Sequence, residues 1–151
     1  MPSPQSGSKL SDATLGQFQG AILEALLAGL PLPGHSRPLN LPDLPLVLGQ
    51  PDVVVSSENL GGPVRVEGAN RTIYILSEED ILQRAKQRGD FSYLRFRPPQ
   101  AIRNDVLLTL QIRIAQEDPL KPTLGLSGIQ VTFRQIGTRW QAAEDTAEFA
   151  A

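Results

Sequence analysis

The C-terminal half of the chain alternates between apolar and polar residues, which is the pattern of β-strands that bury one face. Over residues 105–115 (DVLLTLQIRIA) the alternation puts the apolar side chains on one face. The same pattern recurs over 91–97, 129–135 and 139–145, and a Gly-Thr pair at 137–138 has the length of a tight hairpin loop. These stretches predict an antiparallel sheet of four strands or more.

The N-terminal part has the other periodicity, with apolar residues spaced three and four positions apart as on one side of a helix. The stripe consists of Leu15, Phe18, Ile22 and Leu26. Ser11 is a favourable N-cap and Gly29 a favourable stop, so the pattern predicts a helix over about 12–29. Because further leucines widen the stripe, we expect this helix to be buried, against its own core or against a partner chain.

Shorter elements are predicted between these two regions. Residues 53–55 are a short apolar strand, and 63–76 (PVRVEGANRTIYIL) alternate like a hairpin around GANR. Ser77 begins a second, short helix that has acidic residues in its first turn and basic residues in its last, and Gly89 ends it.

The order of elements predicts one α+β domain over residues 11–148. We expect a curved antiparallel sheet of four or more strands packed on the N-terminal helix, with a second short helix beside it. The apolar face of the sheet needs a cover, and the N-terminal helix is the element available to provide it. Residues 1–10 contain almost no apolar side chains, so we expect them to be a disordered tail.

A proline-rich connector follows the first helix over residues 30–51. Its core, LPLPGHSRPLNLPDLP, contains five prolines and the only histidine of the chain. Prolines restrict the backbone, so the segment can follow one path while leucines such as Leu41 and Leu44 pack on a surface. We interpret it as a packed connector with His35 in an exposed bend, and not as an active site. His35→Ala should then be nearly neutral, whereas Leu41→Asp or Leu44→Asp should impair folding or association.

Composition narrows the class of protein. The chain has 151 residues, 40% of them hydrophobic, and a net charge of -2, which gives no reason to expect nucleic acid or an anionic membrane as partner. Cysteine is absent, which excludes disulfides and thiolate chemistry and favours a reducing, cytoplasmic location. The longest apolar run is interrupted by Gln17, Gln19 and Glu24, so we expect no membrane span.

Arginines are the most numerous candidate binding residues. Arg113 and Arg134 fall on the polar side of neighbouring predicted strands, and Arg95 shares the side of Phe91 and Tyr93. Such a face would bind an anion or an acidic partner. The alternative, which we favour, is a solvated face that carries cross-strand pairs.

Other chemistry is sparse. A histidine-based metal site needs more imidazoles than this chain has, and no carboxylate spacing matches a calcium loop, so we expect no metal and no cofactor. Glu144 falls on the same side of its strand as Trp140 and Ala142 and would point inward. A carboxylate in apolar surroundings has a raised pKa and can act as an acid or base.

The order of elements also resembles a known superfamily. A helix, short strands, a small helix and a long meander ending in IGTRWQAAED are similar to the NTF2-like (cystatin-like) proteins over residues 11–148. The resemblance implies a curved sheet wrapped around a long helix. The long proline-rich insert and the strands between 52 and 76 depart from that pattern. Because the superfamily includes isomerases, dehydratases, scaffolds and transport factors, the resemblance does not select a function.

We therefore expect a non-catalytic binding or assembly module that acts through protein–protein contacts, with another protein or a second copy as partner. Its contact residues would be Leu41, Leu44, Arg95, Arg113 and Arg134. The alternative is an NTF2-like protein that binds a small ligand, or an enzyme of the isomerase or dehydratase type, with Glu144 as its inward acid or base.

Overall fold

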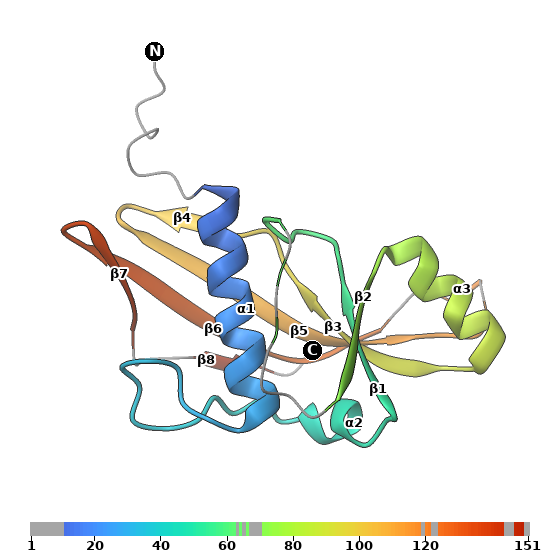
Figure 1. Cartoon of the computed structure of the whole chain (residues 1–151). Coiled ribbons are helices and arrows are strands. Elements are labelled where there is room, and N and C mark those ends of the chain that lie inside the picture. Colours follow the sequence, from blue (N-terminus) through green and yellow to red (C-terminus); the bar gives the residue numbers. More distant parts are fainter. Residues whose placement is uncertain are drawn as a thin grey trace, which may run out of the picture.

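The computed structural model describes residues 11–62, 64, 66, 71–118, 120–121, 124–143 and, for the backbone alone, 147–149. The fold is α+β, as the sequence predicts, with a curled mixed sheet and an N-terminal helix that crosses it (Figure 1). The helices are α1 (Asp12–Ala28), α2 (Leu44–Leu48) and α3 (Glu78–Arg88). The strands are β1 (Asp52–Ser56), β2 (Thr72–Leu76), β3 (Phe91–Phe96), β4 (Gln100–Ile102), β5 (Asp105–Ala115), β6 (Leu124–Ile136), β7 (Arg139–Ala142) and β8 (Ala147–Phe149). The predicted tail over 1–10 lies outside the described residues.

The strands form one sheet in the order β2-β1-β3-β5-β6-β7, with β4 paired to β5 and β8 paired to β6. From β3 to β7 neighbouring strands are antiparallel, which confirms the predicted meander. Ile136 pairs with Arg139, so the loop between β6 and β7 has the predicted two residues. The alternating pattern therefore identified this half of the sheet correctly.

The hairpin predicted over 63–76 is wrong. β2 pairs with β1 in parallel, with Val53 opposite Ile73, and the described residues Val64 and Val66 lie outside any strand. Most of the GANR turn lies outside the described residues. The physical reason lies in β1, because its three valines are all buried and a strand buried on both faces belongs inside a parallel arrangement. Alternation identifies a strand but does not choose its partner.

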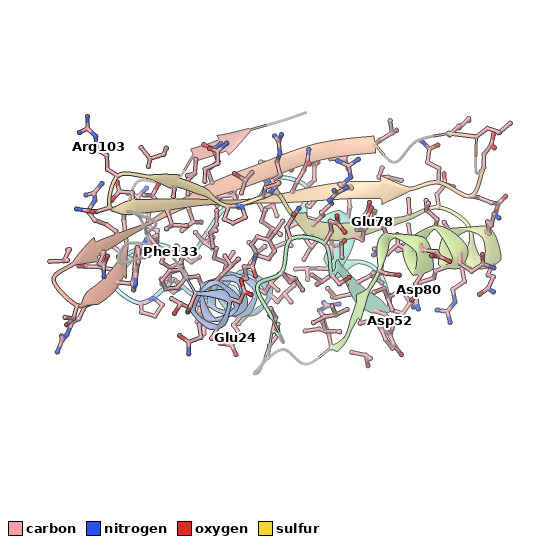
Figure 2. The ribbon with its side chains drawn as sticks, turned by 90° about the horizontal axis from the view of Figure 1, so that it is seen from above. Glu24, Asp52, Glu78, Asp80, Arg103 and Phe133 are labelled. Atoms are coloured by element: carbon pink, nitrogen blue, oxygen red, sulfur yellow. The ribbon has the colours of Figure 1, made fainter. Side chains whose placement is uncertain are left out.

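The two faces of the sheet are covered differently. α1 packs on one face, which includes Val53 and Leu94, whereas α3 packs on the opposite face, which includes Val54 and Tyr93. Figure 2 shows α1 and α3 on opposite sides of β1, with Phe133 on the α1 side of the sheet. α3 packs over β1 and β3 and reaches the end of β5 at the buried Ala115. Beyond α3, Gln130 and Thr132 of β6 are half-exposed on this face, and we call the part of it formed by β5 and β6 the outer strand face.

The two longer helices begin and end where their caps predict. Ser11 Oγ accepts a hydrogen bond from the Thr14 N–H at 3.1 Å, and Ser77 Oγ accepts one from Asp80 at the same distance. α1 ends at Gly29, whose left-handed φ of 70° suits glycine. These local signals set the helix bounds independently of the tertiary structure.

α1 is buried in the protein's own core. On the side of the sheet that α1 covers, Phe18 stacks on Phe133 with ring centroids 4.1 Å apart and meets Trp140 edge-on at 5.5 Å. Ile22 and Leu23 are completely buried. The apolar character of this helix is therefore accounted for without a partner chain.

The proline-rich connector is packed, as predicted, but it is held by specific hydrogen bonds and contains the short helix α2. Asp43 and Ser127 exchange two bonds, with 3.0 Å from the Asp43 N–H to Ser127 Oγ and 3.0 Å from the Ser127 N–H to Asp43 Oδ2. The Gln50 side chain exchanges two more with the backbone of Ser92. The connector therefore joins the sheet at two places through paired bonds.

His35 does not lie in a free, exposed bend. Its ring is half-buried, and Nε2 lies 2.6 Å from the backbone carbonyl oxygen of Ala143, just beyond β7. His35 therefore ties the bend of the connector to the end of the meander, which is a structural role.

No helix in the described part of the chain is both long and apolar enough to cross a membrane.

Candidate functional site: the arginine hollow

The residues expected to form the binding surface lie in different environments. Leu41 is 3% exposed within the core, and Leu44 is partly buried against the same core, so Leu41 is not available on the surface. Arg134 pairs with Asp105 at 3.2 Å near one end of β5. Glu144 lies outside the described residues.

The structure brings Arg95 and Arg113 together around a hollow of about 390 Å³. We call it the arginine hollow. It is lined by Asn59, Arg95, Arg97, Pro98, Gln111 and Arg113. Arg95 lies opposite Gln111 in the antiparallel pairing of β3 with β5, and the Arg97 N–H donates to the Thr109 carbonyl at 2.9 Å, which continues the same register.

The pleat explains why three arginines share one side. Side chains two positions apart in a strand point to the same face, so Arg95 and Arg97 point together. Arg113 lies on the neighbouring strand, opposite Tyr93, whose ring is on the α3 side. A diagonal neighbour across two strands is within reach of a long side chain. All three guanidinium groups are therefore carried by the face that α1 does not cover.

The hollow lies at the carboxyl ends of parallel strands. Asn59 follows β1, and Arg95 and Arg97 lie at the end of β3, which runs parallel to β1. The chain leaves β1 along the α1 face, where Gly61 lies against α1, whereas α3 leads from β2 to β3 across the opposite face. The hollow therefore lies beside the carboxyl ends of β1 and β3.

Glu78, at the start of α3, partly balances the positive charge of the three arginines that line the hollow. Its Oε1 lies 3.5 Å from Arg95 Nη1 and 3.4 Å from the Tyr93 hydroxyl, while its Oε2 accepts a short bond of 2.5 Å from Ser56 Oγ. Figure 2 shows Glu78 beside the strands at the start of α3. With the Arg95 and Glu78 side chains each about 30% exposed, this ion pair is neither fully buried nor fully solvated.

Arg97 differs from Arg95 and Arg113. Its side chain is exposed and makes no hydrogen bond or ion pair with another residue in the described ranges. Arg113 Nη1, by contrast, donates to Gln111 Oε1 at 3.3 Å. The hollow therefore combines two positioned guanidinium groups with one that is available to a ligand.

The loop that forms one wall of the hollow is held in place by α1. Gln19 is completely buried, and it uses both ends of its amide: Nε2 donates to the Asn59 carbonyl at 2.9 Å, and Oε1 accepts from the Gly61 N–H at 3.0 Å. Asn59 Nδ2 in turn donates to the Phe96 carbonyl at 2.9 Å. These bonds link helix, loop and β3, so the wall is preorganised before any ligand binds.

The described lining residues can bind an anion, and none of them is a group that accepts a proton. Guanidinium groups offer planar sets of N–H donors and stay protonated, and the amides of Asn59 and Gln111 do not titrate. Glu78, the nearby carboxylate, already contacts Ser56, Tyr93 and Arg95. The chemistry that this arrangement favours is recognition of a planar or tetrahedral oxyanion.

Sequence reasoning missed several residues of this site. Arg97 has the same strand parity as Arg95, so the alternating pattern already carried a signal for it. Gln19 occupies a position on the apolar side of α1, four residues after Leu15, and a polar residue there indicates a buried hydrogen bond. Nothing in the local sequence indicated Asn59, because its place depends on the packing of its loop.

A second hollow, of about 320 Å³, lies at the other end of α3. There Asp52 Oδ2 lies 3.1 Å from Arg84 Nη2 and 3.9 Å from Arg88 Nη1, and Asp90 also lines the hollow. Its two arginines and two aspartates balance each other, so it has no charge surplus to attract a ligand. Within the described ranges no three His, Cys, Asp or Glu residues are grouped as a metal site would need.

Comparison with known proteins found no matching family model, no matching curated protein and no matching solved structure. The resemblance to the NTF2-like superfamily therefore stays a prediction.

Proposed function

We propose that the protein is a non-catalytic binding module that acts through protein–protein contacts, and that the arginine hollow receives an acidic group of the partner. The observation that carries this proposal is the gathering of Arg95, Arg97 and Arg113 around one hollow on the side of the sheet that α1 does not cover. Three guanidinium groups outweigh the single negative charge of Glu78 and attract an oxyanion. Arginine is also enriched among the interface residues that contribute most of the binding free energy.

The surroundings of the hollow favour a protein partner. The outer strand face continues from the hollow over β5 and β6, where half-exposed polar residues such as Gln130 and Thr132 lie. A charged anchor surrounded by polar, partly exposed side chains is a typical arrangement for a protein interface. The leucines of the connector, by contrast, mostly pack in the core and support the fold.

A non-catalytic role agrees with the chemistry of the lining, whose side chains donate hydrogen bonds but do not exchange protons at neutral pH. The alternative is an enzyme or small-ligand binder of the NTF2-like type with Glu144 as acid or base. The two proposals differ in the residue on which activity depends. The binding module depends on Arg97, and the alternative depends on Glu144.

Affinity purification from the native cell with charge-reversal variants tests the proposal. The wild-type protein and the control Arg37→Glu should retain the partner, because Arg37 is an exposed arginine of the connector far along the chain from the hollow. Arg97→Glu should lose it, while its far-UV circular dichroism and melting temperature stay those of the wild type. A partner that Arg97→Glu retains and Glu144→Gln loses would contradict the proposal and support the alternative.

A further inference from the structure

The four charged side chains described at the hollow carry more positive charge than one carboxylate balances. Arg95, Arg97 and Arg113 contribute +3 and Glu78 contributes -1, so these four groups carry a formal charge of +2. A carboxylate brings a charge of -1, whereas a phosphate monoester brings about -1.5 to -2 near pH 7. Of the two common oxyanions on protein side chains, the phosphate monoester is the one that balances the formal charge of +2 on these four side chains.

The geometry also suits a group with three terminal oxygens. Arg95 lies on β3 and Arg97 lies two positions later, just beyond its end, while Arg113 lies on β5 one diagonal step beyond Arg95. The three guanidinium groups therefore approach the hollow from separate directions, and each can donate to a different phosphate oxygen. The Gln111 amide nitrogen, which has no partner among the described residues, is a further donor in the lining.

The lining distinguishes a phosphorylated side chain from other phosphate compounds. Among the described residues of the lining there is no aromatic ring on which a nucleotide base would stack. The chain has a net charge of -2, so it lacks the general excess of basic residues with which proteins bind anionic lipid surfaces. Beside the hollow, the half-exposed Gln130 and Thr132 of β6 offer polar side chains to an extended peptide.

From these observations we infer that the arginine hollow binds a phosphorylated side chain, carried by an extended segment of a partner protein. The inference rests on the proposed function and names the ligand of the same site. Arg97, whose exposed side chain bonds no other described residue, makes the first contact with the phosphate. Arg95 and Arg113, held by Glu78 and Gln111, complete the cradle without rearrangement of the backbone.

Binding of labelled degenerate nonapeptides, followed by fluorescence polarisation, tests the inference. The probes carry phosphoserine, phosphotyrosine, serine or glutamate at the central position, and inorganic phosphate serves as competitor. At least one phosphorylated library should bind ten-fold or more tightly than the serine and glutamate libraries. Arg97→Gln should remove most of that preference, and the matched control Arg37→Gln should keep it.

Two results would overturn the inference. One is equal binding of phosphorylated and unphosphorylated libraries. The other is competition by inorganic phosphate with no preference for either phosphopeptide library, which would mean that the hollow takes free phosphate and not a modified protein.

Phosphatase treatment of the cell extract before affinity purification separates this inference from the proposed function. If the partner is lost after treatment and also lost by Arg97→Glu, both statements are supported. If the partner survives phosphatase but is lost by Arg97→Glu, the hollow binds an acidic protein segment and only the phosphate inference fails. If the partner survives both changes, the proposed function fails as well.

Discussion

Single polar residues in the core fix the contacts between helices, loops and strands. Gln19 is the clearest case, because one buried amide joins α1 to the carbonyl of Asn59 and to the N–H of Gly61. When a buried polar group loses its partner, the protein loses more stability than an average hydrogen bond contributes. The residue is therefore important both for stability and for the wall of the arginine hollow.

Gln19→Ala should lower the free energy of unfolding by about 1–3 kcal/mol, since it removes a fully buried side chain and leaves the part-buried Asn59 carbonyl and Gly61 N–H without this partner. Urea denaturation measures the change. Gln17→Ala is the matched control, because Gln17 is exposed on the same helix and its loss should change stability by no more than about 0.5 kcal/mol. Equal effects of the two substitutions would contradict the role assigned to Gln19.

His35 carries a second prediction at this scale. The sequence suggested an exposed bend in which His35→Ala is nearly neutral, but the ring bonds the backbone carbonyl of Ala143 at 2.6 Å. Loss of one such bond should cost about 1 kcal/mol of unfolding free energy. Thermal melting of His35→Ala against Arg37→Ala, an exposed neighbour, measures it, and a melting temperature equal to that of the control would show that the bond contributes nothing.

At the scale of elements, the loop between β1 and β2 is placed by its close approach to α1. A Cβ atom on Gly61 would lie 2.5 Å from the Asp12 carbonyl oxygen and 2.7 Å from Leu15 Cβ. Neither neighbour can move away easily, since one is helix backbone and the other is the first atom of a buried side chain. The contact between loop and helix therefore requires glycine for steric reasons.

Gly61→Ala should destabilise the fold by about 1–3 kcal/mol, the usual cost of added volume in a packed site. It should also weaken ligand binding at the arginine hollow, because the displaced loop carries Asn59. Gly62→Ala is the control, since a Cβ there meets nothing within 4 Å. Urea denaturation and peptide binding measure both effects. A Gly61→Ala protein as stable as the Gly62→Ala protein would show that the loop is not held against α1.

At the scale of the whole molecule, the order of the strands sets which parts open first. β5 lies between β3 and β6, so its backbone N–H groups are bonded on both edges, whereas β2 has a strand neighbour on one edge only among the described strands. Interior strands open with free energies near that of global unfolding, and edges open more easily.

Hydrogen–deuterium exchange followed by mass spectrometry should therefore show the slowest exchange in peptides from β5 and the fastest strand exchange in β2. α1 should exchange slowly as well, because Ile22 and Leu23 are completely buried against the sheet. Slower exchange in β2 than in β5 would contradict the strand order.

The fold and the site were predictable to different extents. The caps at Ser11 and Ser77, the stop at Gly29 and the apolar faces of β5 and β6 follow from short-range patterns, and the structure confirms them. Of the predicted contact residues, Arg95 and Arg113 come together, whereas Leu41 is in the core and Arg134 pairs with Asp105 away from the hollow.

The sequence by itself determined the two longer helices, the strands of the C-terminal meander and which of their side chains share a face. These properties depend on capping and on the pleat, which act over a few neighbouring residues. Only the tertiary structure decided that β2 lies parallel to β1, and that Asn59 meets Arg95 and Arg113. The choice of strand partners depends on burying all the apolar faces of the chain at once. A local sequence pattern therefore could not predict where the arginine hollow forms.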